Sequence, residues 1–297
     1  MAVGITPDIS NENSYISVAE YKQAPTALSI STLVVNGNQA AQDAELATVI
    51  LRASSYMNEY LNQNLVATEY TETQRIRYSA SGGYYALHPY NAPVISLSAF
   101  YYGANPNQLN ELQDCSVAWF EGQQIIIPGN QIGWNWTSQG PLQFGGSIGQ
   151  SNYTFTKYTY IAGYANTINT ANTAVGATSI TVEDASGILP GEQYRIFDGE
   201  NTERVTVSSN YTYGSTTVTL QSPMLYAHLA GATFSNLPNA IKEACILITS
   251  AFIKMRGDSS TTMAYTTSPS GNIAGSVRYG NDIAVALDMV NKYRRVR

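Results

Sequence analysis

The sequence of 297 residues has little charge, little cysteine and no long hydrophobic run. Only 12% of the residues are Asp, Glu, Lys or Arg, about half the share of an ordinary globular protein. The two cysteines, Cys115 and Cys245, are too few for a disulfide framework, and no metal-ligand spacing accompanies them. No apolar run approaches the roughly 20 residues of a membrane span, and residues 1–10 lack the basic and apolar regions of a signal peptide. The sequence therefore predicts neither a disulfide-stapled nor a membrane-spanning protein.

The charge that is present is mainly negative, with a net charge of −6 and a pI near 4.9. A protein that holds DNA by its phosphates is usually basic, so we do not expect tight DNA binding by the free monomer. The composition includes 22 tyrosines, a residue type that is enriched in interfaces because it buries a ring and still satisfies a hydroxyl. The alternative interpretation is that these tyrosines cover strand surfaces.

Amphipathic helices are predicted near both ends of the chain. Apolar residues recur at three- and four-residue steps in three segments, Asp43–Leu65, Pro238–Arg256 and Asp282–Arg294. Asp43 and Asp282 are expected to cap the first and the third of these helices. Ser17 and Glu20 have the spacing of a capping box, which predicts a short helix that Pro25 ends.

The middle of the chain has the pattern of β structure. Alternation of polar and apolar residues predicts strands around residues 69–78, 94–102 and 153–162. A second group of predicted strands is separated by Gly-containing turns and covers 179–183, 193–197, 203–208 and 216–221. Small polar segments, 166–173 and 235–237, flank this second group and indicate a domain boundary on each side.

These patterns predict an α+β fold with a helical bundle formed from both chain ends, a β-rich middle and a small inserted all-β domain. The predicted domains are a core of residues 1–166 with 236–297 and an insertion of residues 167–235. Replacing 167–235 would then leave a complete core.

No motif with catalytic or ligand-binding chemistry passes its context test. Residues 145–149 match G-x-S-x-G, but a glycine loop is the better interpretation because no helix follows Ser147. His88 is expected at a strand end, and His228 is expected to fix a turn by hydrogen bonding. Glu200 and Glu203 flank a turn and are expected to be solvated. We therefore predict no catalytic residue, no cofactor and no metal site.

The order of several segments resembles head–tail connector proteins (adaptors) of tailed bacteriophages. Ser14-Tyr15-Ile16-Ser17-Val18-Ala19-Glu20-Tyr21 is similar to their opening, and the long helix to Leu65 to their next element. Further similar segments are Leu87–Leu97 with its Pro-Val pair, Tyr158–Tyr164, Leu237–Ala244 and the chain end at Tyr293-Arg294-Arg295. The resemblance covers roughly residues 14–166 and 236–297. Residues 167–235 depart from the connector pattern and resemble a β module of phage structural proteins.

The resemblance implies a structural virion protein, made in the bacterial host cytoplasm and located at the head–tail junction. Such proteins form a ring, usually of twelve copies, that docks on the portal protein and extends the DNA channel. The ring also provides a platform for the tail or a second connector, so it contributes to genome ejection without specific DNA binding, enzymatic activity or membrane contact.

The basic chain end is the candidate for portal docking. Lys292, Arg294, Arg295 and Arg297 with Tyr293 follow a Gly- and Ser-rich stretch, 259–280, and by resemblance the C-terminal region points toward the portal. The alternative explanation is that these cations complement a helix dipole. The alternative function is a carbohydrate-binding or tail-fibre-type β protein in which Trp119, Trp134 and Trp136 stack on sugars.

Overall fold

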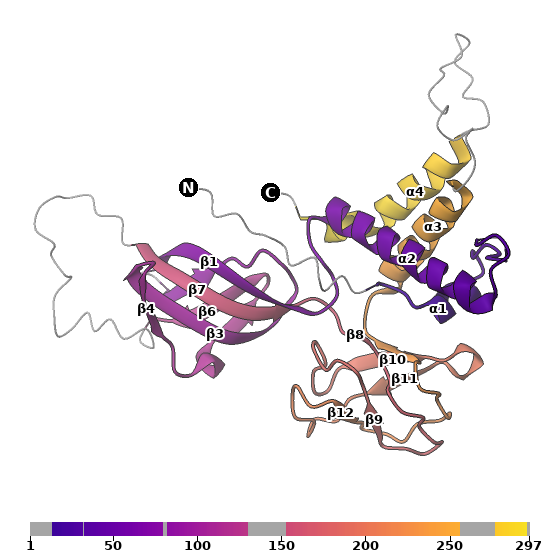
Figure 1. Ribbon diagram of the computed structural model, residues 1–297. Helices are drawn as coiled ribbons and strands as arrows, with labels where there is room; N and C mark the ends of the chain where they lie inside the picture. Colours follow the sequence, from indigo (N-terminus) through magenta and orange to yellow (C-terminus); the bar gives the residue numbers. More distant parts are fainter. Residues whose placement is uncertain (1–13, 32, 80–81, 130–152, 256–276, 296–297) are drawn as a thin grey trace, which may run out of the picture. The chain divides into compact units, whose positions relative to one another are not determined.

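The computed structural model describes residues 14–31, 33–79, 82–129, 153–255 and 277–295. It confirms an α+β fold in which helix α2 packs with α3 and α4, while antiparallel sheets occupy the middle of the chain (Figure 1). Two compact units are present, residues 1–66 with 164–297 and residues 67–163. The first unit contains the helices and the small β structure, and the second contains the larger sheet.

The helices of the first unit are α1 (Val18–Gln23), α2 (Gln39–Leu61), α3 (Asn239–Met255) and α4 (Val277–Val290), followed by the 3-10 turn η5 (Asn291–Tyr293). The predicted capping box is confirmed, because Ser17 accepts a hydrogen bond from the Glu20 amide and Glu20 accepts one from the Ser17 amide. Helix α1 ends at Gln23, before Pro25, as expected.

The two predicted aspartate caps are wrong. Helix α2 begins earlier, because the Asn38 side chain accepts a hydrogen bond from the Ala41 amide at 2.9 Å. Asp43 instead pairs with Lys22 at 2.6 Å. Helix α4 begins at Val277, so Asp282 lies inside it and pairs with Lys254 at 2.8 Å. Each carboxylate is used for an ion pair between helical segments and not for a helix end.

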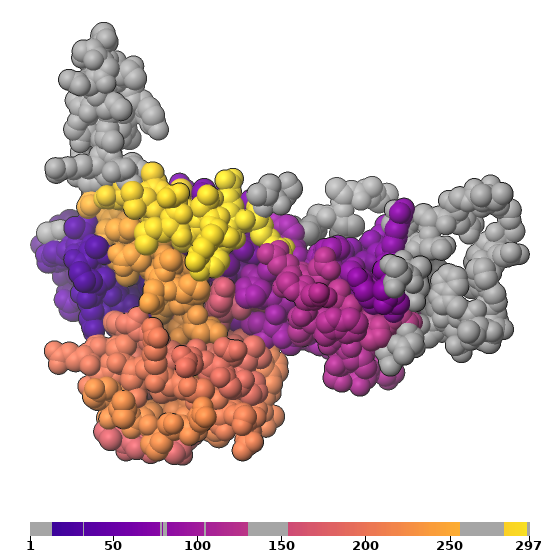
Figure 2. Space-filling model, turned by 180° about the vertical axis from the view of Figure 1, so that it is seen from behind, coloured from indigo at the N-terminus to yellow at the C-terminus, as the bar shows by residue number. Residues whose placement is uncertain are grey.

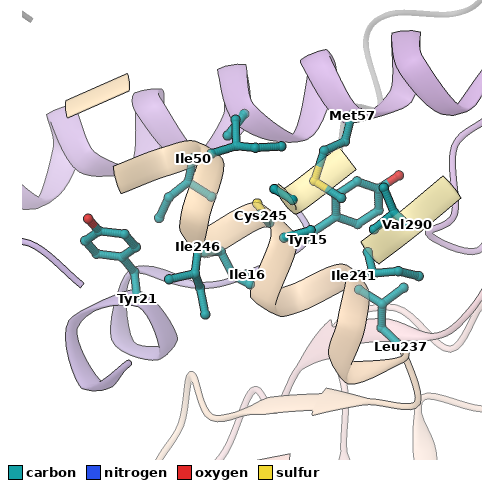
Figure 3. Close-up of a cluster of buried hydrophobic side chains, with 14 of the residues drawn as sticks. Tyr15, Ile16, Tyr21, Ile50, Met57, Leu237, Ile241, Cys245, Ile246 and Val290 are labelled. Carbon is teal, nitrogen blue, oxygen red and sulfur yellow. The ribbon is translucent and has the colours of Figure 1, made fainter. Parts of the chain in front are cut away.

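Side chains from both chain ends meet in one hydrophobic core (Figure 3). Tyr15 and Ile16 come from the segment before α1, Met57 from α2, Ile241 from α3 and Val290 from α4, and each is at most 2% exposed. The core therefore depends on residues nearly 280 positions apart in sequence, and neither chain end can complete it alone.

The second unit is a seven-stranded antiparallel sheet in the order β4-β3-β7-β1-β2-β6-β5. The strands are β1 (Thr68–Ser79), β2 (Tyr84–Leu87), β3 (Val94–Asn105), β4 (Gln108–Glu111), β5 (Trp119–Glu121), β6 (Gln124–Pro128) and β7 (Tyr153–Ala162), with a 3-10 turn η2 (Cys115–Val117) after β4. Phe100, Tyr158 and Tyr160 lie fully buried in its own hydrophobic core.

The small β structure has a four-stranded sheet in the order β11-β10-β13-β8 and a two-stranded sheet of β12 and β9. Its elements are β8 (Asn166–Ile168), β9 (Ser179–Thr181), β10 (Gln193–Phe197), η3 (Gly199–Asn201), β11 (Glu203–Thr206), β12 (Thr217–Thr219) and β13 (Thr233–Ser235). Both predicted polar flanks contribute strands, since Asn166 pairs with Ser235 and Ile168 with Thr233. Strands of three residues are too short for alternation to reveal them in a polar sequence.

Residues 167–235 are predicted to be dispensable for folding of the rest of the chain. They contribute nearly all of a separate hydrophobic core, and the chain enters and leaves at paired positions, with the Asn236 amide donating to the Ala165 carbonyl at 3.1 Å. A short Gly/Ser linker can join such adjacent ends at low entropic cost. We expect the deletion variant to be soluble, with the helical circular-dichroism signal retained. An insoluble or unfolded variant would place the boundary elsewhere.

Candidate functional site

The predicted docking residues lie against the C-terminal end of α2. After α4 and η5, the Arg295 amide donates to the Leu61 carbonyl at 2.9 Å. The side-chain amide of Asn62 donates to the Arg295 carbonyl at 3.0 Å, and that of Gln63 donates to the Tyr293 carbonyl at 2.6 Å. These contacts to the backbone fix the direction of the basic segment, which belongs with α4 to the yellow part of Figure 2.

Two of the cations lie over aromatic rings. The Arg294 guanidinium is 4.9 Å from the centre of the Tyr60 ring, and the Lys292 ammonium is 4.8 Å from the centre of the Tyr293 ring. Both basic side chains are exposed, so the rings restrain them while their charge stays available to an acidic partner. The structure brings Lys292, Tyr293, Arg294 and Arg295 together; Arg297 and residues 259–276 lie outside the described residues, and 277–280 form the first turn of α4.

The expectation that Glu203 is solvated is wrong. Glu203 is 7% exposed, and its carboxylate accepts hydrogen bonds from the Leu225 amide at 3.0 Å and the Tyr226 amide at 3.1 Å. The Nε2 atom of buried His228 lies 2.8 Å from the same carboxylate, and its Nδ1 atom lies 3.5 Å from Asp198. His228 thus fixes a turn, as predicted, and Glu200 is exposed.

The alternation of inward and outward residues along β11 is the sequence signal that could have identified Glu203 as buried. In β11 the burial alternates, with Glu203 and Val205 inside and Arg204 outside. A carboxylate at an inward position needs donors, and the loop amides provide them. Burial alone raises the pKa of Glu203, but the hydrogen bonds from Leu225, His228 and Tyr226 outweigh it, so the pKa lies below its ordinary value of 4.5.

This lowered pKa predicts a pH dependence of stability. Because the pKa of Glu203 is lower in the folded than in the unfolded chain, its ionisation stabilises the fold above pH 4.5, and that contribution is lost as the pH falls through the folded pKa. We expect Glu203→Gln to lower the free energy of unfolding at pH 7 by about 1–3 kcal/mol. The difference from wild type should disappear below the folded pKa.

The measurement is the free energy of unfolding by denaturant, from pH 7 down to below the folded pKa of Glu203. Glu200→Gln is the matched control. The control changes the same net charge at an exposed position nearby. A pH-independent difference for Glu203→Gln, or an equal effect of the control, would contradict the role of the buried carboxylate.

A second carboxylate, of half-buried Glu72, binds two tyrosines in the seven-stranded sheet. Glu72 accepts hydrogen bonds from the Tyr158 and Tyr160 hydroxyls and from the Tyr90 amide. Burial, and then the charge of Glu72, raises the pKa of Tyr160. The cluster has the hydrogen bonds of a structural network, and the alternation of β1 places Glu72 on the same side as buried Ile76.

The thiol of Cys245 on α3 has a structural role. Cys245 is a core thiol, as predicted, and burial raises its pKa to about 12. Beside it, buried Glu20 and Lys242 form an ion pair of 2.6 Å that ties α1 to α3. Thiolate chemistry at Cys245 is therefore disfavoured near neutral pH.

Other sequence motifs contribute less. Ser147, Trp134 and Trp136 lie outside the described residues, whereas Trp119 is 44% exposed on edge strand β5, with its ring centre 6.4 Å from that of Tyr84. His88 follows β2, at a strand end as predicted. Within the described ranges there is no group of three or more potential metal ligands, and none of the described helices is long and apolar enough to cross a membrane.

A shallow groove of about 430 Å³ lies on the outer face of the larger sheet. Its lining combines hydroxyl groups and one ammonium with short apolar side chains, from Thr71, Ala99, Tyr101, Pro106, Asn107, Leu109, Lys157 and Thr159. The Thr71 and Thr159 hydroxyls bond each other at 2.9 Å. This lining has no pair of carboxylates and no nucleophile with an adjacent base.

Comparisons with known proteins provide a likeness in structure. No family model and no curated protein matches the chain. Over 96% of this chain and 95% of the other, the protein is similar in structure to a chain described as the neck of an empty GTA particle computed with C6 symmetry, at 11% identity and with a TM-score of 0.34. Because this TM-score is low, the proposal below is argued from the residues of this chain.

Proposed function

We propose that this chain is a structural protein of a phage-type head–tail junction. In this role it forms a ring that docks on the portal protein, continues the DNA channel and supports the tail or a second connector. The ring number expected from the connector resemblance is twelve. Its function would consist of assembly, with no reaction catalysed and no cofactor.

One observation carries most weight: the opening segment and the start of α3, which both resemble connector proteins, pack into one core. Tyr15, Ile16 and Tyr21 of the opening segment are buried together with Leu237 and Ile241 of the α3 start. The packing gives these two segments a shared structural role, which supports the proposed connector role.

The charge distribution agrees with this role. The chain as a whole is acidic, which disfavours adhesion of DNA that must slide through a channel. Its chain end, in contrast, presents exposed Lys292 and Arg294 on a fixed backbone. We propose that these cations, with Tyr293, Arg295 and Arg297, contact an acidic surface of the portal protein.

The experiment is reconstitution on tailless, portal-bearing capsids of the parent particle. We expect the purified chain to bind at a single vertex and to be visible there as an added collar. Capsids that stay bare at saturating protein would refute the docking role. Specific retention on immobilised glycans, with no capsid binding, would favour the carbohydrate-binding alternative, for which exposed Trp119 is the supporting residue.

A further inference from the structure

Arg294 lies where the chain end contacts the last turn of α2. Its guanidinium is 4.9 Å from the centre of the Tyr60 ring. That ring is half-buried against the helical core, and its hydroxyl donates a hydrogen bond to the Asn291 side chain at 3.1 Å. Because the ring is held both by packing and by this hydrogen bond, it gives the guanidinium a fixed aromatic surface to lie on.

The backbone on both sides of Arg294 is held by residues at the end of α2. Asn62 ends this helix in the left-handed conformation, with a φ of 54°, and its side-chain amide donates to the Arg295 carbonyl at 3.0 Å. Gln63 is 8% exposed, and its side-chain amide donates to the Tyr293 carbonyl at 2.6 Å. Since the neighbours of Arg294 are already fixed, little conformational entropy remains to be lost when a partner binds this residue.

The hydrogen-bond donors of the Arg294 guanidinium are available to a partner. Within the described part of the chain, this group has no ion-pair partner and no hydrogen-bond acceptor. Glu59, beside Tyr60, and Asp288, on α4, are exposed carboxylates, but neither of them forms an ion pair with Arg294 or Lys292. A guanidinium can bind both oxygens of a carboxylate at once, through two parallel hydrogen bonds.

A protein carboxylate suits this site better than a DNA phosphate, although the fork of a guanidinium matches both groups. The chain has a net charge of −6, and exposed Glu59 and Asp288 add negative charge on the two helices that adjoin the chain end. A polyanion such as DNA is repelled by both contributions. A single Asp or Glu side chain carries one negative charge, so its repulsion is smaller and the fork can offset it.

We infer that Arg294 determines the specificity of docking by binding one Asp or Glu side chain of the portal protein through two parallel hydrogen bonds. Tyr60, Asn62 and Gln63 are positioning residues: the first orients the guanidinium, and the other two hold the backbone on either side of it. Lys292 lies over an adjacent ring of the chain end itself and adds charge without a fork. Arginine and tyrosine are typical of the few residues that dominate an interface. This inference rests on the proposed function, which supplies the partner.

Arg294→Lys in the full chain tests the inference, because it keeps the positive charge and removes the fork. We expect the apparent Kd for portal-bearing capsids to rise at least about tenfold, with unchanged melting. Tyr60→Leu should also weaken binding, and Tyr60→Phe, which keeps the ring, should recover most of the loss. Arg204→Lys makes the same exchange at an exposed position of β11 and should bind like wild type.

Asn62→Gly tests the positioning role with a readout that does not need the portal. Glycine keeps the left-handed conformation of the helix end but has no side-chain amide for the Arg295 carbonyl. Trypsin should then cleave after Arg294 several-fold faster, because the chain end opens more often, and capsid binding should weaken while the melting temperature changes little. Unchanged cleavage and unchanged binding would show that this amide does not position the chain end.

The outcomes separate the inference from the proposed function. Equal binding of Arg294→Lys and wild type, with loss only on charge reversal, would show that charge alone carries docking, which overturns the inference and leaves the proposed function intact. Capsids that bind no wild-type protein overturn both. A short DNA duplex that binds the wild type and not Arg294→Lys, in the absence of capsid binding, would assign the fork to phosphate and overturn the carboxylate partner.

Discussion

Replacing Leu46 or Ile248 by Asp should abolish folding of the helical core. Both side chains are fully buried, one on α2 and the other on α3. Each change deletes a packed side chain, at about 2–5 kcal/mol, and places a carboxylate where no donor is prepared for it, which costs several kcal/mol more. The sum is comparable with the whole stability of a typical domain, about 5–15 kcal/mol.

Solubility and the helical circular-dichroism signal measure this effect, and Leu51→Asp provides the control. Leu51 lies on the same helix but is 38% exposed, so its substitution should leave the melting temperature nearly unchanged. Wild-type-like melting of Leu46→Asp and Ile248→Asp would show that the chain ends do not form the folding core.

Reversing the exposed charges of the chain end should abolish portal docking. In Lys292→Glu with Arg294→Glu, two cations that lie over the Tyr293 and Tyr60 rings become anions. The backbone contacts that hold the segment to α2 do not use these side chains, so the fold should persist. Like charges facing the acidic portal surface that we propose would cost several kcal/mol, and we expect capsid binding to fall by at least about a hundredfold.

Charge reversal is a sharper test than truncation of the chain end. Cutting after Met289 would also remove Val290, which is fully buried in the helical core, and loss of binding could then reflect unfolding. Arg204→Glu, an exposed cation on β11, is the matched control and should bind normally. Undiminished binding of the double variant would show that docking is carried elsewhere, with the strand region of residues 84–102 as the next candidate.

The sequence predicted the helices and the longer strands because their periodic patterns extend over many residues. The apolar stripe of α2 and the alternation of β7 (Tyr153–Ala162) are examples, and the predicted and observed bounds of β7 agree. The helix starts were predicted less well. An aspartate before a helix is a common cap, but Asp43 and Asp282 form ion pairs with Lys22 and Lys254, residues that only the tertiary fold brings near.

Tertiary contacts also explain why the polar clusters were missed. Glu203 accepts a hydrogen bond from the Leu225 amide, 22 residues away in sequence. Glu72 accepts one from the Tyr160 hydroxyl, 88 residues away. Local patterns indicate which face of a strand such a residue occupies, but not the donors that it will find there. The exposed apolar side chains of Leu225 and Leu229 were missed for the same reason, because only the fold shows that Met224 and His228 between and beside them are buried.

The measurement that tests the central claim most directly is electron microscopy of the purified full-length protein, alone and bound to portal-bearing capsids. A connector should form a closed ring with an axial opening, and on capsids the ring should lie coaxial with the portal and leave its channel open. Monomers that remain dispersed at all concentrations and never occupy the portal vertex would contradict the proposed role.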